Sequence, residues 1–215
     1  RLYGIMNCTT QTVSGEKYAH IDDQGRYRVK MPFDLSDSKE DEASAPIRLA
    51  SPHAGAGYGM HFPQHGGVEV VWACIDGNPD RPIGLGTVPN PNNPSPVSQG
   101  NKSANIINTA AGNTFQMQDK GGGEQIKLST PYSNSKITIG APASGEGIFM
   151  TTDADQTANI GRNRKTLIMG NDRTDILGKR VTVIGKDKEE LVCGKEDEQI
   201  VGNTKKIVMG KSQRI

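Results

Sequence analysis

Three histidines and a glutamate lie close enough in the sequence to raise the question of a zinc site. His53, His61, His65 and Glu69 are separated by 8, 4 and 4 residues. Zinc is bound by imidazole nitrogens and carboxylate oxygens, so these residue types could serve as ligands. The turn clusters "SPHAG" and "PQHGG" interrupt the segment, and no helix is predicted that would bring the four side chains to one face. We therefore predict ordinary surface histidines and no metal site.

Motifs for nucleophilic or phosphate chemistry are also weak. The serine of "SPHAG" lacks the Gly-x-Ser-x-Gly turn that exposes a serine nucleophile. Cys8, Cys74 and Cys193 fit no metal spacing, and their odd number favours free thiols in a reducing compartment. The glycine-rich "GAGYG" and "KGGGE" precede no helix whose N-terminus could hold a phosphate. The sequence predicts no catalytic residue, no cofactor and no enzymatic activity.

Composition favours an elongated all-β protein. Of 215 residues only 33% are hydrophobic, while 26 are glycine and 12 are proline. The apolar positions are mostly Ile, Val, Leu and Met, and helix signals are almost absent. The chain has neither an apolar run of 18 residues nor a leader-like N-terminus, so no membrane span or secretory signal is predicted. Its start inside an apparent strand and its end within a repeat indicate a fragment.

Residues 1–97 are predicted to form an OB-like barrel. Strands of four to eight residues joined by tight turns, with no helix between them, are typical of small antiparallel barrels. The turn "GNPDRP" is expected to be held by Asp80 and Arg81, which would pair or cap. The five predicted strands are "GRYRVKMPF", "PIRLAS", "GYGMHFP", "VEVVWACI" and "RPIGLGTV".

Residues 98–160 are predicted to form a connector and a β-strand neck. The segment "PNPNNPSPVSQGN", residues 89–101, is rich in proline and asparagine and is expected to be a semi-rigid connector. In the strands that follow, Ile126 and Leu128 would share one face, as would Ile137 and Ile139. The predicted strands are "NTFQMQ", "EQIKLST", "SKITIG" and "GIFMTT".

Residues 161–215 contain a glycine at nearly regular steps of 9, 8, 7, 9, 8 and 8 residues. A period near eight is far too short for helical repeats and indicates a β-solenoid shaft with glycine at its corners. The predicted corners are Gly161, Gly170, Gly178, Gly185, Gly194, Gly202 and Gly210. Two apolar residues precede each glycine from Gly170 onward and are the candidates for the shaft core: Ile168, Met169, Ile176, Leu177, Val183, Ile184, Val192, Cys193, Ile200, Val201, Val208 and Met209.

The shaft repeat is predicted to need several chains. Eight residues make a short strand and a corner, too few for a complete coil of one chain, and every strand would have an open edge. Winding identical chains around one axis would close these edges, and a homotrimeric β-prism is the preferred solution. Neighbouring strand residues point to opposite sides, so only one of the two apolar columns can face the axis. The sequence does not decide which.

The chain resembles a known family over essentially its whole length. "IDDQGRYRVKMPFD", "PQHGGVEVVW", "GNPDRPIGLGTV" and "GNTFQMQDKGGGEQIKLST" look like the OB fold and neck of the VgrG proteins. These are type VI secretion spikes related to the cell-puncturing device of contractile phage tails. The resemblance implies a homotrimeric needle whose OB domains form a collar, whose β-prism is the shaft, and which sits on a contractile tube. Membrane puncture and effector delivery are the implied functions.

The resemblance also implies partners and a location. The tail-tube protein would bind at the base through an N-terminal region absent from this sequence, and a tip protein or effector would bind at the shaft end. The spike would assemble in the bacterial cytoplasm and then be secreted or injected into a target envelope. Only the connector separates barrel from shaft here, which leaves no room for the lysozyme domain of the phage relative. The cargo, the target cell, the tip and any tip metal are not predicted.

Three alternatives remain beside the secretion spike. The first is a phage or tailocin spike, which differs from it mainly in the missing ends. The second is a carbohydrate-active β-solenoid, but no aromatic residue follows Gly161 to line a sugar groove. The third is an OB-type nucleic-acid binder, which would need a basic aromatic groove. Residues 1–97 carry 8 basic and 11 acidic side chains, so nucleic acid is not expected as a partner.

Overall fold

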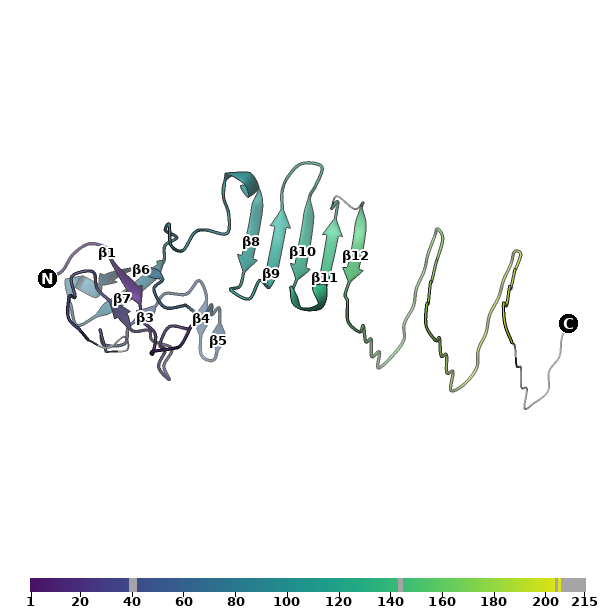
Figure 1. Ribbon diagram of the computed structural model, residues 1–215, viewed down its shortest axis with the longest axis horizontal. Coiled ribbons are helices and arrows are strands. Elements are labelled where there is room, and N and C mark those ends of the chain that lie inside the picture. Colours follow the sequence, from purple (N-terminus) through teal and green to yellow (C-terminus); the bar gives the residue numbers. More distant parts are fainter. Residues whose placement is uncertain (39–41, 143–144, 204, 206–215) are drawn as a thin grey trace. The chain divides into compact units, whose positions relative to one another are not determined.

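The computed structural model describes residues 1–38, 42–142, 145–203 and 205, and it divides the chain into two compact units, Arg1–Ala158 and Asn159–Ile215 (Figure 1). The predicted all-β class is confirmed, because the described regular structure consists of strands and three short 3-10 turns. The 3-10 turns are η1 (Ile75–Gly77), η2 (Gln99–Asn101) and η3 (Tyr132–Asn134).

A five-stranded sheet forms the barrel region of the first unit, in the order β2-β1-β6-β7-β3. β1 pairs antiparallel with β2 and β6, β6 pairs antiparallel with β7, and β3 runs parallel to β7. A separate two-stranded ribbon joins β4 and β5. The strands are β1 (Met6–Thr10), β2 (Val29–Lys30), β3 (Arg48–Leu49), β4 (Ala54–Gly55), β5 (Tyr58–Gly59), β6 (Glu69–Cys74) and β7 (Pro82–Thr87).

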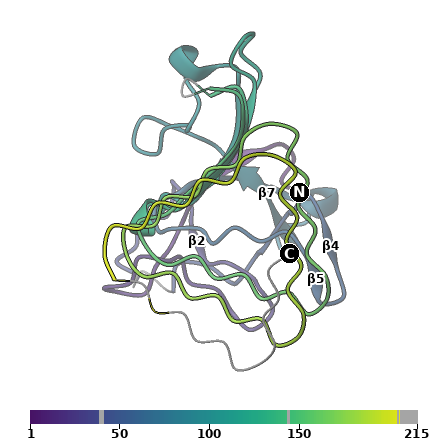
Figure 2. The same cartoon turned by 90° about the vertical axis from the view of Figure 1, so that its right-hand side faces the viewer.

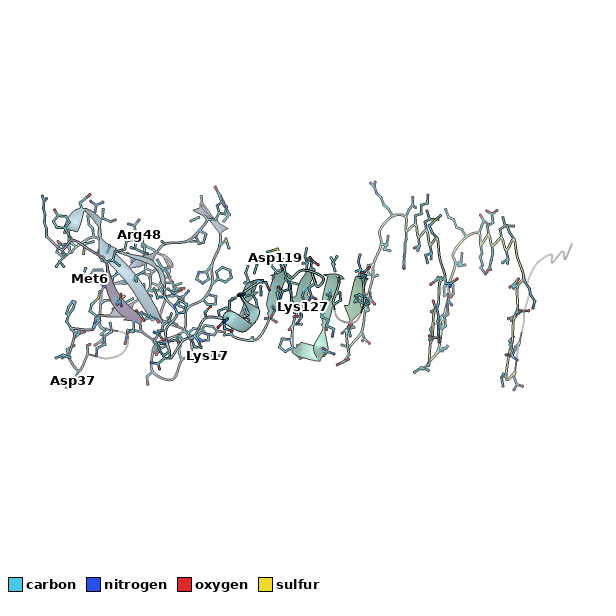
Figure 3. All side chains as sticks on the ribbon, turned by 90° about the horizontal axis from the view of Figure 1, so that it is seen from above. Met6, Lys17, Asp37, Arg48, Asp119 and Lys127 are labelled. Atoms are coloured by element: carbon cyan, nitrogen blue, oxygen red, sulfur yellow. The ribbon has the colours of Figure 1, made fainter. Side chains whose placement is uncertain are left out.

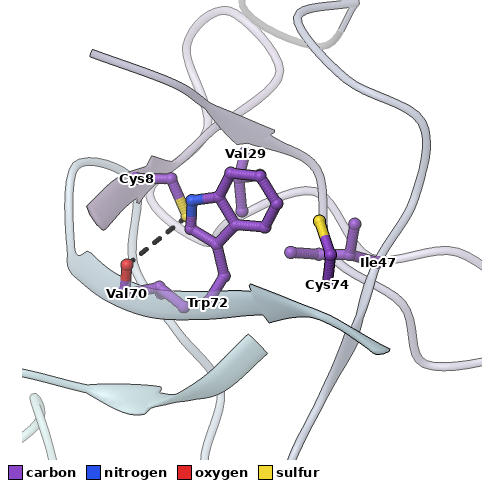
Figure 4. Packing of buried hydrophobic residues seen from close by; sticks show 6 residues of the cluster. All are labelled: Cys8, Val29, Ile47, Val70, Trp72 and Cys74. Atoms are coloured by element: carbon purple, nitrogen blue, oxygen red, sulfur yellow. Dashed lines mark hydrogen bonds between the residues drawn. The ribbon is translucent and has the colours of Figure 1, made fainter. Parts of the chain in front are cut away.

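The barrel core comes from strands that bury every second residue. Along β6, Val70, Trp72 and Cys74 are buried while the residues between them are partly exposed. They pack with Cys8 on β1 and with Val29 and Ile47, and the Trp72 indole lies among these smaller side chains (Figure 4). The indole N–H donates to the Asn7 carbonyl oxygen at 3.4 Å.

A second five-stranded sheet follows the connector as a simple antiparallel meander in the order β12-β11-β10-β9-β8 (Figure 1). Each of its strands has five residues. The four predicted neck strands coincide with β9 to β12, while the first strand of the sheet was not predicted. The strands are β8 (Ala104–Asn108), β9 (Thr114–Gln118), β10 (Gln125–Ser129), β11 (Lys136–Gly140) and β12 (Gly147–Thr151).

The second unit is an open coil. All described residues from Asn159 onward are exposed, and the structure assigns no strand to them. In Figures 1 and 2 the ribbon of this unit runs in straight stretches that meet at corners, and in Figure 2 its successive turns overlie one another. Among its described residues no backbone-to-backbone hydrogen bond is made. Since backbone N–H and C=O groups of a folded protein are nearly always paired, this unit lacks partners within its own chain.

The coil bends at glycine. The described bends of this unit fall on Gly161, Gly170, Gly178, Gly185, Gly194 and Gly202 or the residue beside them, and Gly210 lies outside the described residues. Of these six, only Gly202 has a positive φ, 147°. A methyl group added at any of the six would meet no atom of the chain within 4 Å. The expected reasons for glycine, a positive φ or a close backbone approach, are thus seen within one chain only at Gly202.

One turn differs from its sequence-based description. Arg81 pairs with Asp76, with Nη1 3.3 Å from Oδ2, and not with Asp80. The backbone explains this, because Ile75 N–H donates to the Arg81 carbonyl oxygen at 2.9 Å and sets Arg81 opposite the Ile75–Asp76 segment. Asp80 lies nearer the tip of the turn, where its N–H donates to the Asn78 side chain at 3.0 Å.

Candidate functional site

The histidines of the possible zinc site have separate structural neighbours. The His53 ring lies 5.4 Å from the Tyr58 ring, and the His65 ring meets the Tyr18 ring edge-on at 5.2 Å. The Glu69 carboxylate accepts hydrogen bonds from the side-chain amides of Asn7 and Asn90, at 2.8 and 2.9 Å. Within the part of the chain that the structure describes, no group of three or more His, Cys, Asp or Glu side chains could hold a metal ion. Within the described residues, these side chains do not form one cluster.

The thiols fall into two classes. Cys8 and Cys74 are buried in the barrel, whereas Cys193 is exposed on the coil. Burial raises the pKa of the Cys8 thiol to about 12, so this thiol stays protonated at neutral pH. Its S–H donates to the Val70 carbonyl oxygen at 3.5 Å (Figure 4). Cys8 therefore acts as a small apolar core residue, and Cys193 is the solvent-exposed thiol among the three.

The most unusual surface of the first unit is one face of the second sheet, which we call the neck face. Because strand residues alternate between two sides, each of its strands places large apolar residues on this face, and only Ile106 and Phe149 lie on the other. Their exposed fractions run from 37 to 71%. The neck face consists of Ile107, Phe115, Met117, Ile126, Leu128, Ile137, Ile139, Ile148 and Met150.

The register aligns these side chains into two continuous rows across the sheet. In one row Leu128 lies between Phe115 and Ile137, and the row continues to Ile107 and Met150. In the other, Ile126 lies between Met117 and Ile139, and the row ends at Ile148. Directly opposed apolar residues on neighbouring strands stabilise a sheet, but here their outer surface is left uncovered.

The opposite face of the sheet is polar on its three central strands, while its edge strands contribute Ile106 and Phe149. Gln116, Lys127 and Thr138 lie side by side on adjacent strands, and Thr138 is buried among its neighbours. A sheet with one polar and one apolar face packs the apolar face against something else. Contiguous exposed apolar surface of this extent is typical of protein interaction sites. The neck face is therefore the strongest candidate functional surface of the first unit.

The predicted shaft-core residues are not brought together by one chain. The ten that lie within the described residues, Ile168 to Val201, are all exposed, and Figure 3 shows the side chains of this unit as separate sticks beside the trace. Val208 and Met209 fall outside the described residues. Among the described residues of this unit, three ion pairs join residues two apart: Arg173 with Asp175, Lys188 with Glu190, and Lys195 with Asp197.

A signal for the neck face is present in the sequence. The shared faces of Ile126 with Leu128 and of Ile137 with Ile139 were predicted. The alternation continues in "TFQMQ", and Ile107 of "NIIN" with Ile148 and Met150 of "GIFMT" extends the face to the edge strands. The sequence does not specify the register of the five strands, and it is this register that aligns the residues in two rows.

Comparison with known proteins identifies the barrel. Residues 16–88 match the family of type VI secretion system and phage-baseplate injector OB domains. The type VI secretion system spike protein VgrG4b of Pseudomonas aeruginosa is 29% identical over 133 residues, 59% of this chain and 16% of its own length. VgrG3 of Vibrio cholerae is 30% identical over 131 residues, 58% of this chain and 13% of its own.

One relative extends the similarity into the second unit. The spike protein VgrG1a of Pseudomonas aeruginosa is 28% identical over 208 residues, which is 86% of this chain and 32% of the relative. The chain thus spans a third or less of the length of these relatives. The helices described in the structure include none long and apolar enough to cross a membrane. Residues 16–88 are thus similar to the injector OB domains of type VI secretion systems and phage baseplates, and over most of its length the chain is similar to a VgrG spike protein.

Proposed function

We propose that this chain forms the OB collar, neck and shaft of a type VI secretion spike that works as a homotrimer. The main support is that a match to the injector OB domain occurs together with a neck face that one chain leaves uncovered. Three neck sheets that meet through their apolar faces would bury nine apolar side chains per copy. Burial of this kind is the dominant favourable contribution to association.

The coil supports the same assembly. Its described residues make no backbone-to-backbone hydrogen bonds and are all exposed, so a single copy gives it neither a sheet nor a core. Winding three copies about one axis would pair their backbones with one another and close the open strand edges. A shaft held together by many such interchain bonds would be stiff enough to transmit an axial push.

In this proposal the chain does mechanical work and no covalent chemistry. The spike sits on the tail tube, carries a tip protein or effector at the shaft end, and is pushed through a target membrane when the apparatus contracts. It assembles in the cytoplasm and leaves the cell with its cargo. Residues 1–97 form the collar, 98–160 the connector and neck, and 161–215 the shaft. A phage or tailocin spike is the alternative that shares the same injector OB family.

The proposal is tested in the bacterium that encodes the chain. The codons for the three octads 161–184 are removed in frame, which shortens the shaft and leaves the barrel and neck unchanged. Release of the tail-tube protein into the medium and killing of neighbouring cells are then measured. We expect the shortened spike still to assemble but to lose most of the killing.

The matched control replaces Tyr58, which is exposed on the barrel, with alanine and is expected to leave both readouts unchanged. Full killing by a strain that lacks the entire gene would contradict the proposed function. A second result would contradict the assignment to type VI secretion. In that result, release of the tail-tube protein depends on the gene, but the cells contain no contractile sheath.

A further inference from the structure

The connector, residues 89–101, is held at its barrel end by one carboxylate. The Glu69 side chain accepts from two separate amide groups, at Oε1 from Asn7 Nδ2 (2.8 Å) and at Oε2 from Asn90 Nδ2 (2.9 Å). The Glu69 backbone adds a third bond, because Val88 N–H donates to its carbonyl oxygen at 3.0 Å. A carboxylate accepts at both oxygens, whereas an amide side chain has only one acceptor oxygen. Glu69 therefore joins the connector to two paired strands of the sheet, β6 and β1.

Asn90 extends this attachment into the connector backbone. Its side-chain oxygen accepts from the N–H groups of Asn92 and Asn93, at 3.0 and 2.8 Å, as asparagine side chains commonly do in turns. The backbones of Asn90 and Asn93 also exchange two hydrogen bonds, both 3.0 Å long. The Asn93 side chain returns to the barrel, where Nδ2 donates to the Gly67 carbonyl oxygen at 3.3 Å. Residues 90–93, which we call the barrel-side turn, are thus tied to the barrel at both ends.

A second closed turn forms at the neck end of the connector. The Asn101 side-chain oxygen accepts from the Ser98 N–H at 2.6 Å and from the Ser98 hydroxyl at 3.2 Å. Asn101 Nδ2 donates to the Pro96 carbonyl oxygen at 3.0 Å, and the Asn101 N–H donates to the Ser98 carbonyl oxygen at 3.2 Å. Residues 96–101, which we call the neck-side turn, lead into β8.

Pro94 and Ser95 lie between the two turns and are exposed. Among the described residues, no hydrogen bond, ion pair or strand pairing joins residues 1–94 to residues 95–158. The backbone here still has little freedom, because φ is fixed at both prolines and a residue before proline is restricted to extended conformations. Ser95 stands alone between Pro94 and Pro96. The soft torsions that remain are ψ of Pro94 and φ of Ser95.

We infer that the connector is a strap with one joint. Glu69 fixes its barrel-side turn, Asn101 closes its neck-side turn, and the barrel and the neck reorient against each other about Pro94 and Ser95. Such a joint lets the neck turn while the length of the strap stays constant, which a connector that was flexible throughout would not do. It is a property of a single chain and does not depend on the assembly of three copies.

Glu69 acts in this strap as a positioning residue. Without its side-chain contact to Asn90, the free segment would begin at Pro89, directly after the backbone bond of Val88. The joint would then extend over the whole barrel-side turn. Mobility within the connector is therefore the quantity that depends on Glu69.

The test measures this mobility with a nitroxide spin label at three exposed positions. In a Cys193→Ser background, which removes the exposed thiol, the label is attached in turn to Asn92→Cys, Ser95→Cys and Gln99→Cys. Electron paramagnetic resonance spectra report how fast each label reorients on the nanosecond timescale. We expect the label at the joint to reorient about three times faster than the labels in the barrel-side and neck-side turns.

Two substitutions should release the barrel-side turn. Glu69→Gln leaves one acceptor oxygen for two amide donors, and Asn90→Ala removes the amide that reaches Glu69. In both proteins we expect the label in the barrel-side turn to become as mobile as the label at the joint, while the label in the neck-side turn is unchanged. Glu16→Gln, at an exposed glutamate of the barrel, is the matched control and should change none of the spectra.

Three results would overturn this assignment. A label in the barrel-side turn that is as mobile as the label at the joint, while Glu69 is present, would show that this turn is not fixed. A slow label there in both Glu69→Gln and Asn90→Ala would show that Glu69 is not its anchor. Equally slow labels at all three positions would show that there is no joint.

The result is independent of the proposed function. The melting temperature of the barrel is measured in each variant, and if Glu69→Gln unfolds the barrel, Asn90→Ala decides the role of the contact. Because the labels report on the connector of each chain, the mass of the assembly in solution tests the three-chain spike separately.

Discussion

The barrel and the coil differ in how far one chain buries its own side chains and pairs its own backbone. In the barrel, Trp72 and Val70 are buried by residues from the same chain, and the strands pair with one another. In the coil, every described residue is exposed and no described backbone group bonds to another. The neck lies between these extremes, with paired strands but an uncovered apolar face. The contrast shows that the burial of apolar residues by the chain itself decreases from the barrel to the neck and the coil.

The largest expected effect comes from a charge on the neck face. Leu128→Asp places a carboxylate in the middle strand of the sheet, where three copies would bury it. Each copy loses about 2 kcal/mol of apolar burial, and the desolvated carboxylates add a further penalty. We expect the mass in solution to fall from three chains to one while the barrel keeps its melting temperature.

The control for this substitution lies on the next residue. Lys127→Asp changes the polar face of the same strand and is expected to keep the three-chain mass. A Leu128→Asp protein that still assembles would show that the neck face is not the contact surface.

The next largest effect concerns the stability of the barrel. Trp72→Ala leaves a cavity in the barrel core, and large-to-small core substitutions of this type destabilise by about 3 to 5 kcal/mol. Urea unfolding followed by circular dichroism should show an earlier barrel transition. Tyr58→Ala, an exposed aromatic truncation in the same region, should leave it in place. An unchanged transition in Trp72→Ala would contradict the view that the barrel depends on its own core.

Glycine substitutions in the coil are expected to have a smaller effect. Gly202→Val forces a β-branched residue to a φ of 147°, which costs roughly 1 to 3 kcal/mol of backbone strain. Gly185→Val has no close neighbour within its own chain, so its effect would come from the approach of another copy. Both should lower the thermal stability of the assembly. Lys179→Val, beside another corner, is the control, and melting profiles unchanged by all three would count against glycine as a corner determinant.

The smallest effect is a pH dependence of the barrel. Hydrogen bonds from the Arg26 side chain and backbone hold the pKa of the Asp22 carboxyl below its ordinary value. A lowered folded-state pKa contributes stability above the unfolded-state pKa, and this contribution is lost as pH falls through the folded-state pKa. The barrel of the unmodified protein should therefore lose more stability than that of Asp22→Asn on acidification below about pH 4. Parallel melting curves of the two proteins would exclude this contribution.

Much of the fold could be predicted from alternation and turn residues. β7 and β9 to β11 follow from runs in which every second residue is apolar, and β6 and β12 follow from short continuous apolar runs. β1 was missed because "MNCTT" has only two large apolar residues, and β8 because "ANIIN" places two isoleucines together. Arg81 was assigned the wrong partner because the backbone pairing of Ile75 with Arg81 depends on strands brought together by the fold.

The candidate surface was less predictable than the fold. The apolar residues of the neck were visible in the sequence, but only the register of five strands turns them into two rows. In the coil, the sequence does not distinguish the two members of a pair such as Ile176 and Leu177, because both are apolar and both precede a glycine. In the structure, however, Ile176 is 48% exposed and Leu177 is fully exposed.

The most direct test of the account is the absolute mass of the chain in solution, measured by light scattering behind a sizing column. One chain has a mass of 23.1 kDa. The account predicts a particle of three times that mass that elutes earlier than a compact protein of the same mass. A monomer of 23.1 kDa would contradict it, because the neck face and the coil would then remain without the partners that their structure requires.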